Sequence, residues 1–269
     1  MNFWDHFKRD KHLIIAHRGA RAYRAENTMS AFAYANGRCD FVEFDVGFSR
    51  DGVAVIIHDD TLERTSDVRE HPEFSAPYLV SDYDHDTLKK LDFGSWFLRD
   101  DTFGTIKLGT ASKHDLLELE KQTILTLEAL LIYLKSNRML ANIEIKDMSN
   151  TAFDDHAAAS VLDIVKRMQM QDNVCISSFN HKYLQQLYEL DPLIETAALQ
   201  ENEHPKDLVH YLETLHVGSY NPDFEITDEA LIRTLNDAGF FVNVFTVNEQ
   251  KDIDQLFKWG AKSVFPVFV

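Results

Sequence analysis

Three acidic residues interrupt otherwise apolar stretches of this sequence, and they are the first candidates for chemistry. Glu43 and Asp45 alternate with apolar residues in FVEFDV (41–46), and Glu144 does so in IEI (143–145). If these stretches are β-strands, Glu43 and Asp45 share one face, because side chains two positions apart point the same way. Carboxylates that lose hydration together need a compensating cation. Three carboxylates without a thiolate favour a hard divalent ion, Mg²⁺ or Ca²⁺.

Two basic residues at the ends of apolar runs, Arg18 and Lys146, offer a second explanation for the acidic groups. Either could form an ion pair with a carboxylate, and Lys146 lies two residues after Glu144, on the same face of the strand. In an active site they would instead bind a phosphate. The planar fork of Arg18 could hold two phosphate oxygens, whereas Lys146 would act as a point charge.

Two histidines, His17 and His58, directly follow the apolar runs IIA (14–16) and VAVII (53–57). Imidazole can give or take a proton near neutral pH. A pair on opposite sides of a phosphodiester could therefore activate the nucleophile and protonate the departing alkoxide. The alternatives are metal ligation and histidines that merely end strands and bind backbone groups.

Three further residues are candidates for a substrate pocket. Asn27 precedes a helical pattern that starts at Thr28, so it contacts substrate or is only a helix-start residue. Phe179 and Phe245 stand at the ends of apolar runs, where an aromatic ring can pack against an apolar part of a ligand. Packing in the core is the alternative for both rings.

Short β-branched or aromatic runs alternate with helical patterns, as in parallel βα units. We expect strands near residues 13–16, 41–47, 139–145, 174–178, 194–199, 215–219, 241–246 and 263–267. Helices are expected at 28–36, 126–136, 153–169, 180–190, 205–213, 228–237 and 249–258. This pattern predicts a single α/β domain over residues 1–269, a closed (β/α)8 TIM barrel of ordinary size.

The second strand is expected to continue into a hairpin and an insertion. Asp51-Gly52 is a turn signal between residues able to pair, and a two-residue turn there would set Asp45 opposite His58. A slip of one residue would turn the histidine to the other face. From about 60 to 122 the pattern is irregular and charged. Because this segment is too long for an ordinary βα loop, we expect a small inserted subdomain above the barrel.

Composition excludes several classes of partner. A formal net charge of −17 makes non-specific binding to nucleic acid or to an anionic bilayer unfavourable, whereas a small polar substrate remains compatible. The chain has no long apolar run and no apolar signal core at its start, so we expect a cytoplasmic protein without stable membrane insertion. Cys39 and Cys175 lie in or beside apolar runs and are expected to be buried free thiols.

Taken together, the motifs make the sequence resemble the glycerophosphodiester phosphodiesterase family. The resemblance spans residues 14 to 248. It rests on AHRG (16–19), ENT (26–28), VEFDV (42–46), DG (51–52), HDDTLERT (58–65), GSW (94–96), NIEIK (142–146), SSF (177–179) and FTVN (245–248). Each tetrapeptide alone is weak, but their joint order and spacing are highly specific.

The resemblance implies a barrel with an insertion after the second strand, a divalent ion, and hydrolysis of glycerophosphodiesters to glycerol phosphate and an alcohol. By matching positions it implies acid/base roles for His17 and His58, metal binding by Glu43, Asp45 and Glu144, and phosphate contacts from Arg18 and Lys146. Two departures bear on substrate preference. The final strand, within 260–269, lacks a Thr-Asp pair frequent in the family, and Phe245 stands where Trp is frequent.

Two other functions compete with this one. Phospholipase D-like cleavage of lysophospholipids could use the same site, although by resemblance an elaborate insertion goes with small soluble diesters. A barrel that binds phosphodiesters without cleaving them would not need both histidines and the full carboxylate set. Direct attack by water and attack by the glycerol hydroxyl through a cyclic phosphate are both compatible with these residues, as are a monomer and an oligomer.

Overall fold

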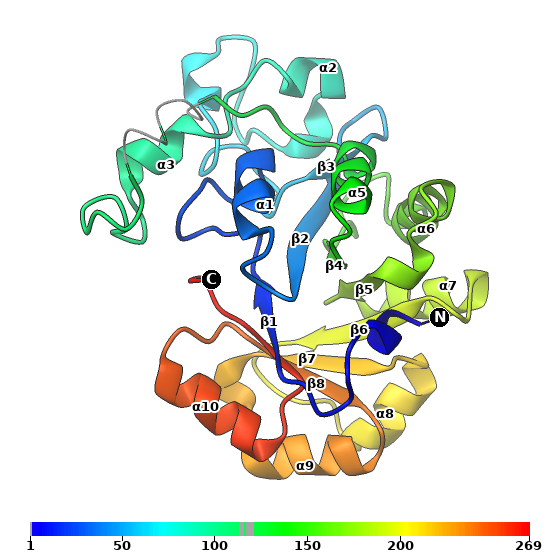
Figure 1. The fold of residues 1–269 in the computed structure, drawn as a ribbon. Coiled ribbons are helices and arrows are strands. Elements are labelled where there is room, and N and C mark those ends of the chain that lie inside the picture. The colour runs from blue at the N-terminus through cyan, green and yellow to red at the C-terminus, as the bar shows by residue number, and fades with distance from the viewer. Residues whose placement is uncertain (1, 113–115, 117–120) are drawn as a thin grey trace.

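The structure is a computed structural model that describes residues 2–112, 116 and 121–269. Its sheet contains β1 (Leu13–Ala16), β2 (Phe41–Phe48), β3 (Ala54–Ile56), β4 (Ala141–Ile145), β5 (Val174–Ser178), β6 (Glu195–Gln200), β7 (Ser219–Pro222), β8 (Phe241–Phe245) and β9 (Ser263–Phe265). All strands except β3 are parallel to their neighbours, in the order β1-β9-β8-β7-β6-β5-β4-β2. Because β1 also pairs with β2, the sheet closes (Figure 1). The expected (β/α)8 barrel is confirmed.

Helices between the strands cover the outside of the barrel (Figure 1). They are α1 (Met29–Ala35), α5 (Leu127–Ser136), α6 (Ala157–Arg167), α7 (His181–Leu190), α8 (Leu208–Leu215), α9 (Glu229–Asp237) and α10 (Gln250–Trp259). Polar caps fix where several of them begin: Thr28 Oγ1 accepts from the Ala31 amide at 3.3 Å and Asp228 Oδ1 from the Leu231 amide at 2.8 Å. Within the described residues, none of the helices has both the length and the apolarity needed to cross a bilayer.

One expected strand is displaced along the chain. The sequence predicted a strand at 215–219, but the strand in this position, β7, begins at Ser219. Leu212 and Leu215 lie three residues apart and are both buried, so Leu215 completes the apolar face of α8 instead. The helix then ends at His216, whose backbone is left-handed with φ of 56°. The prediction was therefore wrong in assigning Leu215 to the strand, because this residue belongs to the end of α8.

The turn between β2 and β3 is one residue longer than expected. Their ladder extends to Ser49, whose amide donates to the Val53 carbonyl at 3.0 Å. Residues 50–52 therefore form a three-residue loop, which Gly52 closes with φ of +82°. Glycine adopts this left-handed conformation without steric cost, as such three-residue hairpin loops require.

The longer turn shifts the register of β3 by one residue. The Ile57 amide donates to the Asp45 carbonyl at 3.0 Å, so Asp45 lies opposite Ile57. The expected pairing of Asp45 with His58 is wrong. His58 comes after the paired residues, and its ring still lines the same pocket as Glu43.

The segment between β3 and α5 contains the short helices α2 (His85–Leu88) and α3 (Ser95–Asp100). In Figure 1, α2 lies above α1 and β2, and α3 lies to the left of α1. It also contains the 3-10 turns η2 (Val68–Glu70) and η3 (Val80–Asp82). A buried apolar cluster joins it to the hairpin and to the residues before α5: Val55, Ile57, Leu62, Val68, Phe74, Val80, Leu88, Leu91, Phe93 and Ile124. The segment is therefore anchored on β3, which pairs with the carboxyl-terminal half of β2.

The 3-10 helix η1 (Phe3–His6) packs where several barrel strands begin. The Phe3 ring meets Phe41 at a centroid distance of 5.2 Å, and Trp4 meets Phe241 at 4.6 Å. Glu195, at the start of β6, accepts a hydrogen bond from Trp4 Nε1 at 3.0 Å. Burial raises the pKa of Glu195 even though Asn2 and Trp4 both donate to its carboxylate.

This burial predicts a pH-dependent contribution to stability. A carboxyl whose pKa is higher in the folded state stabilises the protein below its unfolded pKa, and this contribution is lost as pH rises through the folded pKa. Relative to a Glu195→Gln variant, the wild type should therefore lose unfolding free energy as the pH rises from about 4, near the ordinary pKa of glutamate, towards neutrality. Urea unfolding of both proteins across this range measures the difference, and a difference independent of pH would contradict the assignment.

Candidate active site

Three carboxylates meet inside the barrel, on the two neighbouring strands β2 and β4. The parallel register places Asp45 beside Glu144, and Glu43 precedes Asp45 by two residues on the same face. One oxygen from each carboxylate lies within 4.8 Å of the others. The residues are almost fully buried, with exposures of 2% for Glu43, 0% for Asp45 and 8% for Glu144. The structure thus brings together the acidic residues that the sequence singled out.

In the carboxylate cluster formed by Glu43, Asp45 and Glu144, neighbouring positive charges and hydrogen-bond donors only partly compensate the negative charge. Burial raises the pKa of Glu43 well above its usual range, and the charges of Asp45 and Glu144 raise it further. Burial followed by the charge of Asp45 likewise raises the pKa of Glu144. Among the described residues, Glu43 Oε1 and Asp45 Oδ1 are buried and have no hydrogen-bond partner. A buried, oxygen-rich donor set with unsatisfied acceptors fits a hard divalent cation.

Two cations border the cluster, so the ion pairs considered from the sequence also form. Lys146 Nζ lies 2.6 Å from Glu144 Oε1 and 3.7 Å from Asp45 Oδ1. Arg18 Nε lies 3.5 Å from Asp45 Oδ2, and the Arg18 amide donates to Glu43 Oε2 at 2.8 Å. Burial opposes ionisation of Asp45, but Arg18 and Lys146 outweigh it and lower the pKa of this carboxyl. Two positive side chains still do not balance three carboxylates.

The two histidines differ in their surroundings. His17 lies just after β1, with Nε2 4.0 Å from Glu43 Oε2 and Nδ1 3.3 Å from Thr246 Oγ1. Burial, followed by the charges of Arg18 and Arg21, lowers the pKa of His17 well below its usual range. The lowered pKa favours the neutral form of the His17 ring, whose free nitrogen can accept a proton. His58 Nδ1 instead lies 2.6 Å from Asp59 Oδ1, so this ring carries its own carboxylate partner.

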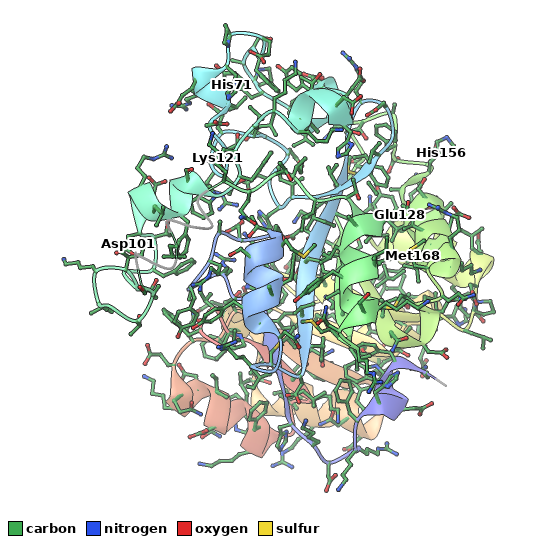
Figure 2. The ribbon with its side chains drawn as sticks, turned by 45° about the horizontal axis from the view of Figure 1, so that its top comes forward. His71, Asp101, Lys121, Glu128, His156 and Met168 are labelled. Atoms are coloured by element: carbon green, nitrogen blue, oxygen red, sulfur yellow. The ribbon has the colours of Figure 1, made fainter. Side chains whose placement is uncertain are left out.

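A pocket of about 490 Å³ opens over these groups. Eight of the ten residues selected from the sequence line it: His17, Arg18, Glu43, His58, Glu144, Lys146, Phe179 and Phe245. The rings of Phe179 and Phe245 meet edge to face at 5.8 Å, and Phe179 is 37% exposed. They form an apolar wall beside the charged groups. By contrast, His156 at the start of α6 and His71 in the insertion are seen at the periphery of Figure 2.

Asp45 and Asn27 lie behind the lining of this pocket. Asn27 Nδ2 donates to Asp45 Oδ2 at 2.8 Å, and Asn27 is only 7% exposed. Its backbone is left-handed, with φ of 58°. Asn27 therefore donates to a carboxylate of the cluster, and its contact with substrate stays a prediction.

The pocket also contains polar residues that sequence reasoning missed, namely Asp60, Asn142, Asp147, Glu201 and Asp223. Asp223 directly follows β7, so a correctly placed strand would have selected it as a strand-end residue. Asn142 precedes Glu144 by two residues on β4 and is 3% exposed, with an unpaired buried Oδ1. The alternation that identified Glu144 applies equally to Asn142.

Comparison with known proteins agrees with this geometry. A model of the glycerophosphoryl diester phosphodiesterase family matches residues 17–266. A glycerophosphodiester phosphodiesterase of Bacillus altitudinis is 31% identical over 261 residues, which cover 95% of this chain and 94% of the relative. One of Bacillus subtilis is 26% identical over 266 residues, covering 95% and 83%.

Solved structures give the same result. A phosphodiesterase of Oleispira antarctica in complex with the product sn-glycerol-3-phosphate superposes with a TM-score of 0.81 at 25% identity, covering 100% of this chain and 96% of that one. A structure from Silicibacter pomeroyi has the same fold, with a TM-score of 0.79 at 23% identity, covering 96% of this chain and 90% of that one. The family expected from the sequence motifs is confirmed: the chain belongs to the glycerophosphoryl diester phosphodiesterase family.

Proposed function

We propose that this phosphodiesterase hydrolyses glycerophosphodiesters to glycerol phosphate and an alcohol by divalent-metal-assisted acid/base catalysis. The observation that carries the proposal is the cluster of Glu43, Asp45 and Glu144, in which one oxygen of each carboxylate lies within 4.8 Å of the others. Glu43 and Glu144 line a pocket that is also lined by His17 and His58. Such a set combines cation binding with proton transfer, as phosphodiester cleavage requires.

The metal ligands in this proposal are Glu43, Asp45 and Glu144, and the ion is Mg²⁺ or Ca²⁺. Glu43 Oε1 and Asp45 Oδ1 support the assignment, because buried carboxylate oxygens that accept no hydrogen bond suit a hard cation. When bound, a divalent ion supplies positive charge to a phosphoryl oxygen. Arg18 and Lys146, which both line the pocket, provide the remaining positive charge that holds an anionic diester.

Proton transfer is divided between the histidines. The neutral His17 ring takes a proton from the attacking hydroxyl group, of water or of the neighbouring glycerol carbon. The P–O bond to the alcohol breaks, and the protonated ring of His58 gives its proton to the departing oxygen, while Asp59 at 2.6 Å offsets the positive charge of that ring. Attack by the glycerol hydroxyl would yield a cyclic phosphate that is hydrolysed next, and detection of this product would identify that route.

Replacing His17 by Ala should reduce kcat by about 10²- to 10⁴-fold, because the base that deprotonates the nucleophile is removed. His156→Ala is the matched control, since this histidine is exposed at the start of α6. Both variants should unfold at temperatures close to that of the wild type. Wild-type turnover in a folded His17→Ala protein would rule out the acid/base assignment.

Metal binding should be visible without any assay of activity. Mg²⁺ or Ca²⁺ at a hundredfold excess over its Kd should add about 2.7 kcal/mol to the unfolding free energy, because the ion binds only the folded protein. Glu43→Gln should abolish this gain. Glu201→Gln, at an exposed carboxylate of the same pocket, should retain it. An equal gain in the Glu43→Gln variant, measured by calorimetry, would exclude the cluster as the metal site.

The choice of substrate tests the competing lysophospholipase D-like activity. Glycerophosphocholine should be turned over with a higher kcat/KM than lysophosphatidylcholine, because small diesters fit the pocket of about 490 Å³ whereas an acyl chain exceeds it. Parallel assays below the critical micelle concentration of the lipid compare the two. A preference for the lysophospholipid would reverse the proposed substrate class.

A further inference from the structure

Arg64, at the beginning of the inserted segment, joins two carboxylates that come from different parts of the chain. Its Nε and Nη2 donate to Asp59 Oδ2 at 2.6 Å and to Asp59 Oδ1 at 2.9 Å. Nη2 also donates to Glu26 Oε1 at 2.7 Å. The planar guanidinium thus holds both oxygens of one carboxylate and one oxygen of another, a geometry that a lysine could not reproduce.

Each of these carboxylates in turn holds a residue of the proposed catalytic machinery. Asp59 Oδ1 lies 2.6 Å from His58 Nδ1. Glu26 Oε1 accepts from Arg18 Nη1 at 3.0 Å. A continuous chain of hydrogen bonds therefore runs from the imidazole proposed as proton donor, through Arg64, to the guanidinium proposed to bind phosphate.

The carboxylates in this chain are charged, so the bonds are strong. Burial opposes the ionisation of Glu26, but the hydrogen bond from Arg64 and the charges of Arg18 and Arg21 lower its pKa to about 2. Glu26 is only 5% exposed, and removal of Arg64 would leave its buried charge with weaker compensation. Charge-assisted hydrogen bonds are roughly twice as strong as neutral ones.

We infer that Arg64 is a positioning residue that fixes the orientation of His58 through Asp59, while its bond to the buried Glu26 anchors the guanidinium. The inference rests on the proposed function and extends it to a residue that does not line the pocket. Held at both oxygens, Asp59 keeps the His58 ring in one orientation and keeps the proton on Nδ1, which leaves Nε2 to act on the leaving oxygen. Without Arg64 the Asp59 carboxylate can rotate, and His58 loses its fixed orientation.

Another arginine with the same kind of ion pair provides the matched control. Arg69 donates to Glu63 Oε1 through Nε at 3.2 Å and through Nη2 at 2.7 Å. Its side chain is 73% exposed, and neither Arg69 nor Glu63 lines the pocket. A general loss of surface charge or of an ion pair in the insertion would affect Arg69→Gln and Arg64→Gln alike.

The test is steady-state hydrolysis of glycerophosphocholine with saturating Mg²⁺ or Ca²⁺. Arg64→Gln should lower kcat by about 10- to 100-fold with little change in KM, because supporting residues orient a catalytic group without binding substrate. Arg64→Lys should recover part of the loss, and Arg69→Gln should match the wild type. Thermal unfolding verifies that every variant is folded.

A double-mutant cycle with Asp59→Asn tests the route of the effect. If Arg64 acts through Asp59, the double variant should be no slower than the slower single variant. The inference would be overturned if the decreases in kcat of the two single variants multiplied in the double variant. It would also be overturned if Arg64→Gln were as fast as the Arg69→Gln control. An inactive wild type would instead refute the proposed function. If the wild type is active and the His17→Ala variant is inactive, the proposed function stands, whether or not the Arg64→Gln variant loses activity.

Discussion

The burial of three like charges is the constraint on which the rest of this site depends. Glu43, Asp45 and Glu144 cannot move apart, because the hydrogen bonds between β2 and β4 fix their strands in register. They cannot recover their hydration either, because each is at most 8% exposed. Desolvation and mutual repulsion both favour protonation, so a site that keeps these groups ionised must bring positive charge to them.

Positive charge is concentrated locally in a protein whose net charge is −17. Arg18 and Lys146 lie at the cluster itself, while Arg21 and Arg64 reach the same region through Glu26. Such an arrangement can attract an anionic diester to one pocket even though the protein as a whole would repel it. It also adds to the effect of burial on His17, because the neighbouring guanidinium charges lower the pKa of its ring further.

The sequence was sufficient for features that depend on local periodicity. The alternation around Glu43 and Asp45 predicts their common face, and the succession of strands and helices predicts the closed barrel. Prediction from the sequence failed where the result depends on whether a loop has one residue more or less. Asp51-Gly52 is compatible with loops of two and of three residues, so the pairing of Asp45 with His58 was misplaced.

Other features could not be predicted because no local pattern encodes them. Arg64 and Glu26 are 38 positions apart, and their contact depends on how the insertion packs on the barrel. Asn27 resembled a helix-start residue, yet its amide orients Asp45, 18 positions away. Sequence motifs therefore located the groups that we propose to react, whereas the residues that contact those groups emerged only from the fold.

Anomalous scattering from crystals of the wild-type protein grown with Mn²⁺, a substitute for the native hard cation, tests the central claim most directly. Our account predicts a single strong peak within about 2.0 to 2.6 Å of oxygens from Glu43, Asp45 and Glu144. A cluster without a peak at saturating Mn²⁺, or with its only peak elsewhere on the surface, would contradict the claim that these carboxylates share a metal ion.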